Sequence, residues 1–108
     1  MAYTTIVQQL TNLRSLNLKF NYIITGKGIK GLTNLKKINL WGNSEIRDDD
    51  IENLNLEILV LDNESSITID GIKYLSNLKK IKCAKTAEIG PKMYDLLMQR
   101  KIKISYIY

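Results

Sequence analysis

Apolar and polar positions repeat along this chain with a period of 21 or 22 residues. Residues 24–38 match residues 67–81 at 11 of 15 positions, and their offset of 43 corresponds to two shorter units. Each unit opens on an aliphatic residue, and leucines follow at a spacing of three, except that the second leucine of the third unit comes one residue early. The opening residues are Val7, Ile29, Ile51 and Ile72, spaced 22, 22 and 21 apart. A repeat of this length indicates a solenoid in which each unit forms one coil.

Two apolar residues separated by a single residue recur in every unit. Because alternate side chains of a strand face opposite ways, each pair predicts a short strand that buries both members. Stacked coils would align these strands as a parallel sheet. The leucines of the segments that connect one strand to the next, which we call the return limbs, would complete the core. The pairs are Leu16/Leu18, Ile38/Leu40, Leu59/Leu61, Ile81/Cys83 and Ile102/Ile104.

A polar residue follows each of the first four pairs by three positions. In the first two units it is asparagine, Asn21 and Asn43. We interpret these asparagines as structural, with amides that bond backbone groups of neighbouring coils. Glu64 and Thr86 hold the position in the next two units, which predicts weaker bonding between coils there.

The stretches LTNLRSLNLKFN (10–21) and LTNLKKINLWGN (32–43) resemble the leucine-rich repeat, LxxLxLxxN, in its 22-residue form. Repeats of this form occur in internalin-type bacterial proteins and phosphatase-regulator-type proteins. The resemblance covers roughly residues 6–105 and departs from the motif at Cys83, Glu64 and Thr86. It implies an α/β leucine-rich-repeat solenoid, a curved right-handed superhelix with short parallel strands on the concave face. Helical turns or extended limbs would form the convex face.

The last unit differs from the others. Gly90 and Pro91 precede KMYDLLMQRK, in which Met93, Leu96 and Leu97 have helical spacing. Proline at a first helical position predicts a helix over 91–100, which leads into a final strand. We interpret residues 1–108 as a single domain of about four repeats, with residues 91–108 as a C-terminal capping helix and last strand.

Composition excludes most catalytic chemistry. The 108 residues contain no histidine and one cysteine, so histidine-based triads, histidine metal sites and an internal disulfide are absent. We expect no enzyme activity, no cofactor and no metal. One unpaired cysteine fits a reducing compartment, and the opening residues lack the apolar run of a secretory leader, so we expect a cytoplasmic protein.

Two further motifs suggest chemistry but fit structural roles better. The acidic run Asp48–Asp50 lacks the spacing of a calcium loop and suits the start of a helical turn. The glycines Gly26, Gly28 and Gly31 match G-x-G-x-x-G by letter, but they fall in a repeat turn without the strand and full helix that nucleotide binding needs. Cys83 falls in a core column, so we expect a small buried side chain there.

Charge forms three bands along the sequence. Residues 1–44 carry +6, residues 45–72 carry −8, and residues 73–108 carry +7, which gives the net charge of +5. Alternating bands of basic and acidic charge argue against one continuous basic surface that binds nucleic acid. They are compatible with self-association of an acidic middle with a basic end.

Strand alternation also predicts which side chains face away from the core. In the last unit these are Lys101, Lys103 and Ser105. Trp41, Ile58 and Val60 are apolar residues on this face, surrounded by lysines, which is typical of a binding hot spot. The predicted partner-binding residues are Asn17, Lys19, Lys37, Asn39, Trp41, Ile58, Val60, Asp62, Lys80, Lys82 and Lys103.

The sequence therefore predicts a non-enzymatic module that binds another protein on its concave face. The partner would carry an apolar element with acidic flanks. The alternative is a structural or self-assembling protein, a homo-oligomer that pairs through exposed strand edges. Nucleic-acid binding through the lysine-rich last coils is a weaker alternative, because aromatic stacking residues are scarce there apart from Tyr106 and Tyr108. No membrane partner is expected.

Overall fold

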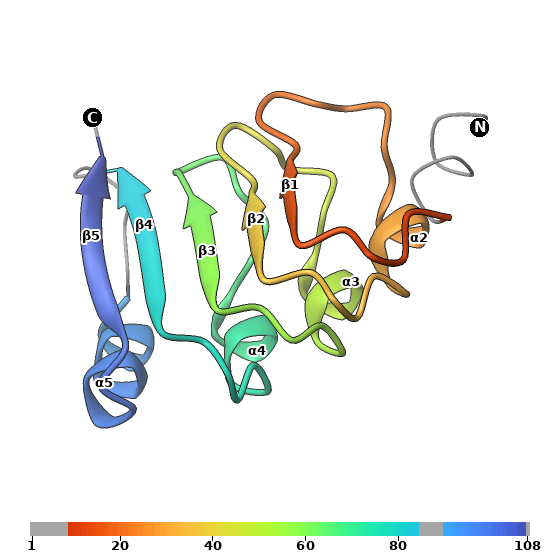
Figure 1. The fold of residues 1–108 in the computed structure, drawn as a ribbon. Helices are drawn as coiled ribbons and strands as arrows, with labels where there is room; N and C mark the ends of the chain where they lie inside the picture. Colours follow the sequence, from red (N-terminus) through yellow and green to blue (C-terminus); the bar gives the residue numbers. More distant parts are fainter. Residues whose placement is uncertain (1–8, 85–89, 108) are drawn as a thin grey trace.

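The computed structural model describes residues 9–84 and 90–107. In these residues the chain winds into coils that each contribute one strand to a single parallel sheet, in the order β1-β2-β3-β4-β5 (Figure 1). The strands are β1 (Ser15–Asn17), β2 (Lys37–Asn39), β3 (Ile58–Leu61), β4 (Lys80–Ala84) and β5 (Lys103–Ile107). The sequence order and the spatial order of the strands are therefore the same, as the repeat predicts.

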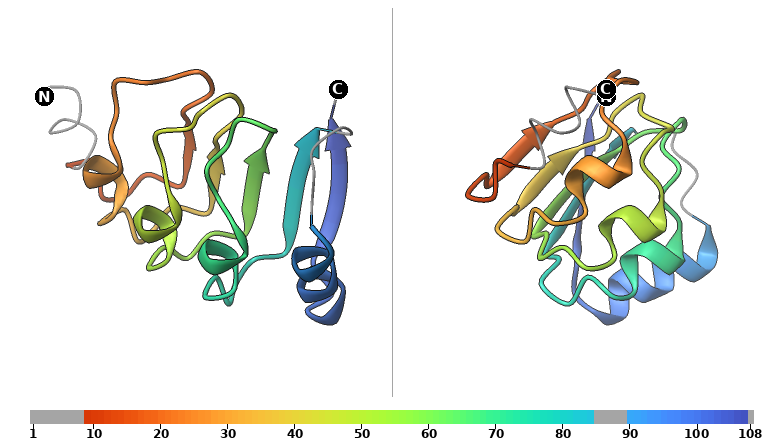
Figure 2. Two further views of the ribbon diagram at one scale, coloured as in Figure 1. Left: turned by 180° about the vertical axis from the view of Figure 1, so that it is seen from behind. Right: turned by 90° about the vertical axis from the view of Figure 1, so that its right-hand side faces the viewer.

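Each return limb contains a helix, and these helices all lie on the same side of the sheet, as both views in Figure 2 show. The helices are α2 (Gly26–Ile29), α3 (Asp48–Ile51), α4 (Ile69–Ile72) and α5 (Pro91–Gln99). Three of them are single turns, and α5 is a longer helix of nine residues. The predicted α/β solenoid with strands on one face and helical turns on the other is confirmed.

The core lies between the sheet and these helices. Strand pairing places Leu16, Ile38 and Leu59 in one row, with Ile81 following in β4. The members in β2, β3 and β4 are fully buried, whereas Leu16 is only partly buried. The leucines of the return limbs fill the space behind the strands, and their columns include Leu32, Leu54 and Leu75. The core columns that the spacing predicts are thus present from the second coil onward, whereas Leu10, predicted to lie in the same column, is 46% exposed in the first described coil.

Asn43 joins two coils in the way the sequence predicts. Its side chain is completely buried, and its amide nitrogen donates to the backbone oxygens of Leu18 (2.9 Å) and Asn21 (2.7 Å). Its amide oxygen accepts from the backbone nitrogens of Glu45 (2.9 Å) and Ile46 (3.2 Å). Every donor and acceptor of this buried amide is used, so the residue is structural.

In the third unit the residue that takes this role is Ser65 and not Glu64, which corrects the prediction. The Ser65 hydroxyl donates to the backbone oxygen of Leu40 (2.8 Å) and accepts from the backbone nitrogen of Asp62 (3.1 Å). Glu64 is exposed. The strand β3 is one residue longer than β2, and the hydrogen-bonded turn after it starts at Asp62 and not at Leu61, so the inward position falls four residues after Leu61 and not three.

The acidic run forms the first turn of α3, as predicted, and it fixes neighbouring coils. Asp48 accepts hydrogen bonds from the backbone nitrogen of Thr68 (2.7 Å) and from its hydroxyl, and Asp50 accepts from the backbone nitrogen of Arg47 (2.9 Å). A Cβ at Gly26 would overlap the Asp50 side chain, and one at Gly71 would overlap Asp48. These glycines are needed for the close approach of adjacent turns.

The last coil follows the prediction in its helix but not in its register. Leu97 is fully buried, and Met93 and Leu96 pack against the core. The strand, however, pairs Ile104 with Ile81, so the predicted pairing of Ile102 with Ile81 is wrong by two residues. A helix of nine residues followed by a turn with Lys101 at φ 57° makes this unit longer and delays the strand. Val7, Thr86 and Tyr108, named above, lie outside the described residues.

Within the part of the chain that the structure describes, no helix has the length and hydrophobicity needed to cross a membrane.

Candidate functional site

The sheet turns one face away from the helices, and we call it the sheet face. Strand pairing arranges its side chains in three rows that cross the strands. The amino-end row is Ser15, Lys37, Ile58, Lys80 and Lys103. The middle row is Asn17, Asn39, Val60, Lys82 and Ser105. The carboxyl-end row is Lys19, Trp41, Asp62, Ala84 and Ile107. All eleven residues predicted to bind the partner therefore belong to one surface.

The register of β5 changes the composition of this surface. Lys103 lies beside Lys80, and Ser105 lies beside Lys82. Lys101 precedes the strand and is not part of the sheet face, so its predicted place there is wrong. Ile107 takes the outer position instead, beside Ala84, and sequence reasoning missed it because the predicted strand was placed two residues too early.

Trp41 lines a hollow on the sheet face. The hollow has a volume of about 190 Å³ and is lined by Lys19, Asn39, Trp41, Val60 and Ile107. Residues from β2, β3 and β5 enclose the same space, so the sheet face is dished and not flat. The volume and the mixed lining suit the insertion of a single apolar side chain with a polar rim.

Val60 is less accessible than the alternation suggests. Only 3% of its surface is exposed, although it points to the sheet face. Trp41 and Ile107 line the hollow around it, so Val60 forms the floor of the hollow while Trp41 forms its wall. Ile58, one row away, is partly exposed.

The asparagines of the middle row turn back onto their own strands. The side-chain oxygen of Asn17 accepts from the backbone nitrogen of Lys19 (2.9 Å), and that of Asn39 accepts from the backbone nitrogen of Trp41 (3.0 Å). Asp62 makes the same contact with the backbone nitrogen of Glu64 (3.1 Å). These three side chains shape the strand ends and hold the backbone that carries Lys19 and Trp41.

The lysines of the sheet face have no acidic partner among residues 9–84 and 90–107. The ion pairs of that part of the chain join Lys30 to Asp50, Lys73 to Asp70 and Lys79 to Glu57. None of these lysines belongs to the sheet face, and Asp62 is its one carboxylate in the described residues. The surface around the hollow is therefore strongly positive.

A surface of aromatic and aliphatic side chains continues from the hollow over the carboxyl ends of β1 and β2. Phe20, Tyr22 and Ile23 are each about half exposed. The Lys19 ammonium lies 5.7 Å from the centre of the Phe20 ring and 5.9 Å from that of Trp41. Sequence reasoning missed this feature, although the aromatic residues on either side of Asn21 are visible in the first repeat.

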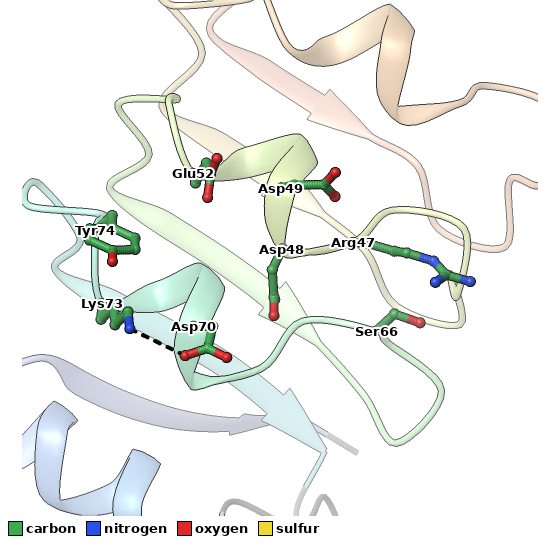
Figure 3. Close-up of a pocket in the computed structure, with 8 residues that line it drawn as sticks. All are labelled: Arg47, Asp48, Asp49, Glu52, Ser66, Asp70, Lys73 and Tyr74. Atoms are coloured by element: carbon green, nitrogen blue, oxygen red, sulfur yellow. Dashed lines mark ion pairs between the residues drawn. The ribbon is translucent and has the colours of Figure 1, made fainter.

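A larger hollow lies on the opposite side, between α3 and α4 (Figure 3). It has a volume of about 820 Å³ and contains four carboxylates. Asp70 forms an ion pair with Lys73 (3.3 Å), and Asp48 bonds Thr68 of the next coil. The hydrogen bond to Asp70 raises the pKa of Lys73 above its ordinary value. The contact between Asp48 and Thr68 joins the two coils that line the groove, whereas the Asp70–Lys73 pair lies within one of them. Its lining is Arg47, Asp48, Asp49, Glu52, Ser66, Asp70, Lys73 and Tyr74.

Other chemical candidates are absent from the part of the chain that the structure describes. Those residues contain no group of three or more histidine, cysteine, aspartate or glutamate side chains that could hold a metal ion. Cys83 is buried and free, and burial raises the pKa of its thiol. A thiol of this kind is a poor nucleophile at neutral pH.

Two comparisons with known proteins complete the description. A family model for leucine-rich repeats, in two copies, matches residues 11–55. These residues contain the first two strands and the helices α2 and α3. No curated protein matches the sequence.

Proposed function

Because the chain is a leucine-rich repeat protein, we propose that it is a non-enzymatic module that binds another protein on its sheet face. Repeats of this family generally mediate protein–protein interaction, which supports the proposal. The contact would centre on Trp41, Ile58 and Val60 and would be rimmed by the lysines of the same face. The free, buried Cys83 supports a reducing, cytoplasmic location.

The hollow beside Trp41 carries this proposal. A tryptophan offers a large area of apolar contact, and tryptophan is enriched among the residues that dominate binding energy. Here it lines the hollow together with the apolar Val60 and Ile107, and Lys19 and Asn39 are the polar residues of the lining. An apolar wall and floor with a polar margin resemble the core and rim of a protein interface.

The test is an affinity purification from a lysate of the source cell, in which the unmodified chain and the variant Trp41→Ala are used as baits and compared. Val60→Asp is unsuitable, because it would put a carboxylate into a site with 3% exposure and would destabilise the fold. Ile58→Asp, in a partly exposed position, is the second variant. Tyr74→Ala on the helical side is the matched control, since Tyr74 is an exposed aromatic residue away from the sheet face.

We expect Trp41→Ala and Ile58→Asp to lose proteins that the unmodified chain and Tyr74→Ala retain. As a hot-spot residue Trp41 should contribute at least about 2 kcal/mol to binding, so Trp41→Ala should weaken the affinity by about 30-fold. Undiminished capture by both sheet-face variants would contradict the assignment to this surface.

A second candidate function is self-assembly through the outer edge of β5. In the described residues this strand pairs only with β4, and it is as long as any strand of the sheet. Tyr106 and Ile107 are exposed along it, and an unpaired edge with apolar side chains favours the addition of another strand. Light scattering over a range of protein concentrations distinguishes the two functions. A monomer throughout would remove self-assembly and leave binding to another protein.

Nucleic-acid binding has less support. Trp41 is the one aromatic side chain in the three rows of the sheet face, whereas Tyr106 alternates to the other side of β5. The exposed rings of Phe20 and Tyr22 lie beyond the carboxyl ends of the first strands and not among Lys80, Lys82 and Lys103, so a lysine surface with one aromatic side chain in its rows fits a protein partner better than a single-stranded nucleic acid.

A further inference from the structure

The aromatic surface beyond the strand ends has a fixed geometry. We call it the aromatic ridge and define it by Phe20, Tyr22 and Trp41. A Cβ at Gly42 would overlap the Phe20 ring, so this ring lies directly on the backbone of the second coil. The Tyr22 hydroxyl donates to the backbone oxygen of Gly42 (2.8 Å). Two neighbouring aromatic side chains are therefore held against one glycine.

The ridge remains exposed although it is held in place. The exposed fractions of Phe20 and Tyr22 are 56% and 54%. Phe20 also has a positive φ of 55°, a conformation that costs a residue other than glycine about 1 kcal/mol. The second coil has Gly42 at the equivalent position, with φ 67°. Rigid, exposed aromatic side chains lose little conformational entropy on binding, which makes them effective contact residues.

Lys19 connects the ridge to the hollow. Its ammonium group lies 5.7 Å and 5.9 Å from the centres of the Phe20 and Trp41 rings, and Lys19 also lines the hollow. No carboxylate in the described residues lies within ion-pair distance of it. An incoming carboxylate at Lys19 would therefore be flanked by apolar contact area on both sides.

The lysines in the other rows extend the same charge across the surface. Lys80 and Lys103 are neighbours in adjacent strands, which lie about 4.8 Å apart, and Lys82 is in the next row of β4. Like charges at such neighbouring positions repel one another. A negatively charged partner would relieve this repulsion, and it would be drawn to the surface by the same field.

We propose that the binding surface extends over the strand ends onto the aromatic ridge and that its partner is an acidic protein segment with two apolar side chains. One apolar side chain enters the hollow, the second lies on Phe20 and Tyr22, and a carboxylate between them meets Lys19. Further carboxylates lie over Lys80, Lys82 and Lys103. This inference rests on the proposed function and adds to it the extent of the surface and the chemistry of the partner.

The test uses a random peptide library displayed on phage as the probe. Peptides of about 15 residues reach ~50 Å when extended, which exceeds the width of the sheet. The best peptide is then synthesised, and its affinity is measured by fluorescence anisotropy against Trp41→Ala, Phe20→Ser, Tyr22→Ser and Lys19→Glu. Tyr94→Ser is the matched control, because Tyr94 is an exposed tyrosine on α5, on the helical side.

We expect selected peptides rich in Asp and Glu with two apolar residues. Phe20→Ser and Tyr22→Ser should each weaken binding by about tenfold, while Tyr94→Ser stays within about twofold. Lys19→Glu should weaken binding to a similar extent, and replacing one peptide glutamate by lysine should recover part of the loss. Recovery by charge exchange shows that the variant is folded and that the pairing is direct.

Each contrary result has a separate meaning. Peptides that depend on Trp41 but not on Phe20, Tyr22 or Lys19 overturn the ridge and leave the proposed function intact. Selected peptides that are neutral or basic, or tighter binding of a mixed-sequence single-stranded RNA, overturn the acidic segment. A dimer in sedimentation that Phe20→Ser dissociates would replace that segment by a second copy. Binding that is indifferent to Trp41 contradicts the proposed function itself.

Discussion

Asn43 shows how much of the stack depends on a single side chain. Its amide donates to the backbone of the first coil and accepts from its own turn, so it satisfies four backbone groups. The side chain is completely buried, and water cannot replace it without a rearrangement. Removing the amide leaves buried donors and acceptors unpaired, which is more costly than the net value of the hydrogen bonds it makes.

We therefore expect Asn43→Ala to lower the free energy of unfolding by about 3 kcal/mol. Asn63→Ala is the control, because Asn63 is an exposed asparagine in the turn after β3 and should change stability by less than about 0.5 kcal/mol. Urea denaturation followed by circular dichroism measures both. Equal effects of the two substitutions would mean that Asn43 does not join the coils.

Cys83 gives a second prediction at this scale. Burial raises the pKa of its thiol, so less thiolate is present near pH 8 than in a free cysteine, and the buried sulfur is also inaccessible to reagent. Modification by an aromatic disulfide reagent should be more than about 100-fold slower in the native protein than in concentrated guanidinium chloride. Rapid labelling of the native protein would place the sulfur at the surface and contradict its position in the core.

At the scale of elements, the hydrophobic pattern predicts the strands well and their ends less well. The apolar pairs determine which residues of β2, β3 and β4 face the core, because only one parity buries them. In the last coil the run from Ile102 to Tyr106 alternates between apolar and polar residues, so parity alone accepts a shift of two residues. The register of β5 against β4 depends on how far the long helix α5 displaces the strand that follows it, and the hydrophobic pattern does not predict this displacement.

Part of the candidate site could also be predicted from the sequence. Alternation identifies the sheet-face side chains of β1 to β4, since these follow from the strand positions. The aromatic ridge depends on contacts between coils, in which Phe20 and Tyr22 rest on Gly42, and no pattern within one repeat reveals that contact. The burial of Val60 likewise arises from its neighbours in space.

The helix α5 provides the prediction at the element scale. Leu97 is its fully buried residue, whereas Met98, the next residue, is 55% exposed. Arg100, just after the helix, donates to the backbone oxygens of Ile72 and Leu75 in the previous coil. Leu97→Ala should lower the free energy of unfolding by about 2–5 kcal/mol, and Met98→Ala by less than about 0.5 kcal/mol. Thermal and urea denaturation check this difference, and similar effects of both would show that α5 is not docked on the core.

At the scale of the whole molecule, the coils form a stack whose principal-axis extents are 39, 24 and 20 Å. The stability of such a stack is a sum of contributions from the coils and from the contacts between neighbours. The first described coil is packed less completely than the second. Leu10, Leu13 and Leu16 are exposed or partly buried, while the equivalent residues Leu32, Leu35 and Ile38 are fully buried. Opening of the stack should therefore begin at β1.

Native-state hydrogen exchange tests this order with an internal control. The backbone nitrogens of Leu18 and Leu40 are equivalent in the repeat, each donates a hydrogen bond of 2.9 Å to the next strand, and each follows an asparagine, so their intrinsic exchange rates match. We expect Leu18 to exchange at least about tenfold faster than Leu40, because β1 can separate from β2 while β2 and β3 stay paired. Equal rates would instead mean that all coils open together in one cooperative transition, and the nearest-neighbour description would fail for this protein.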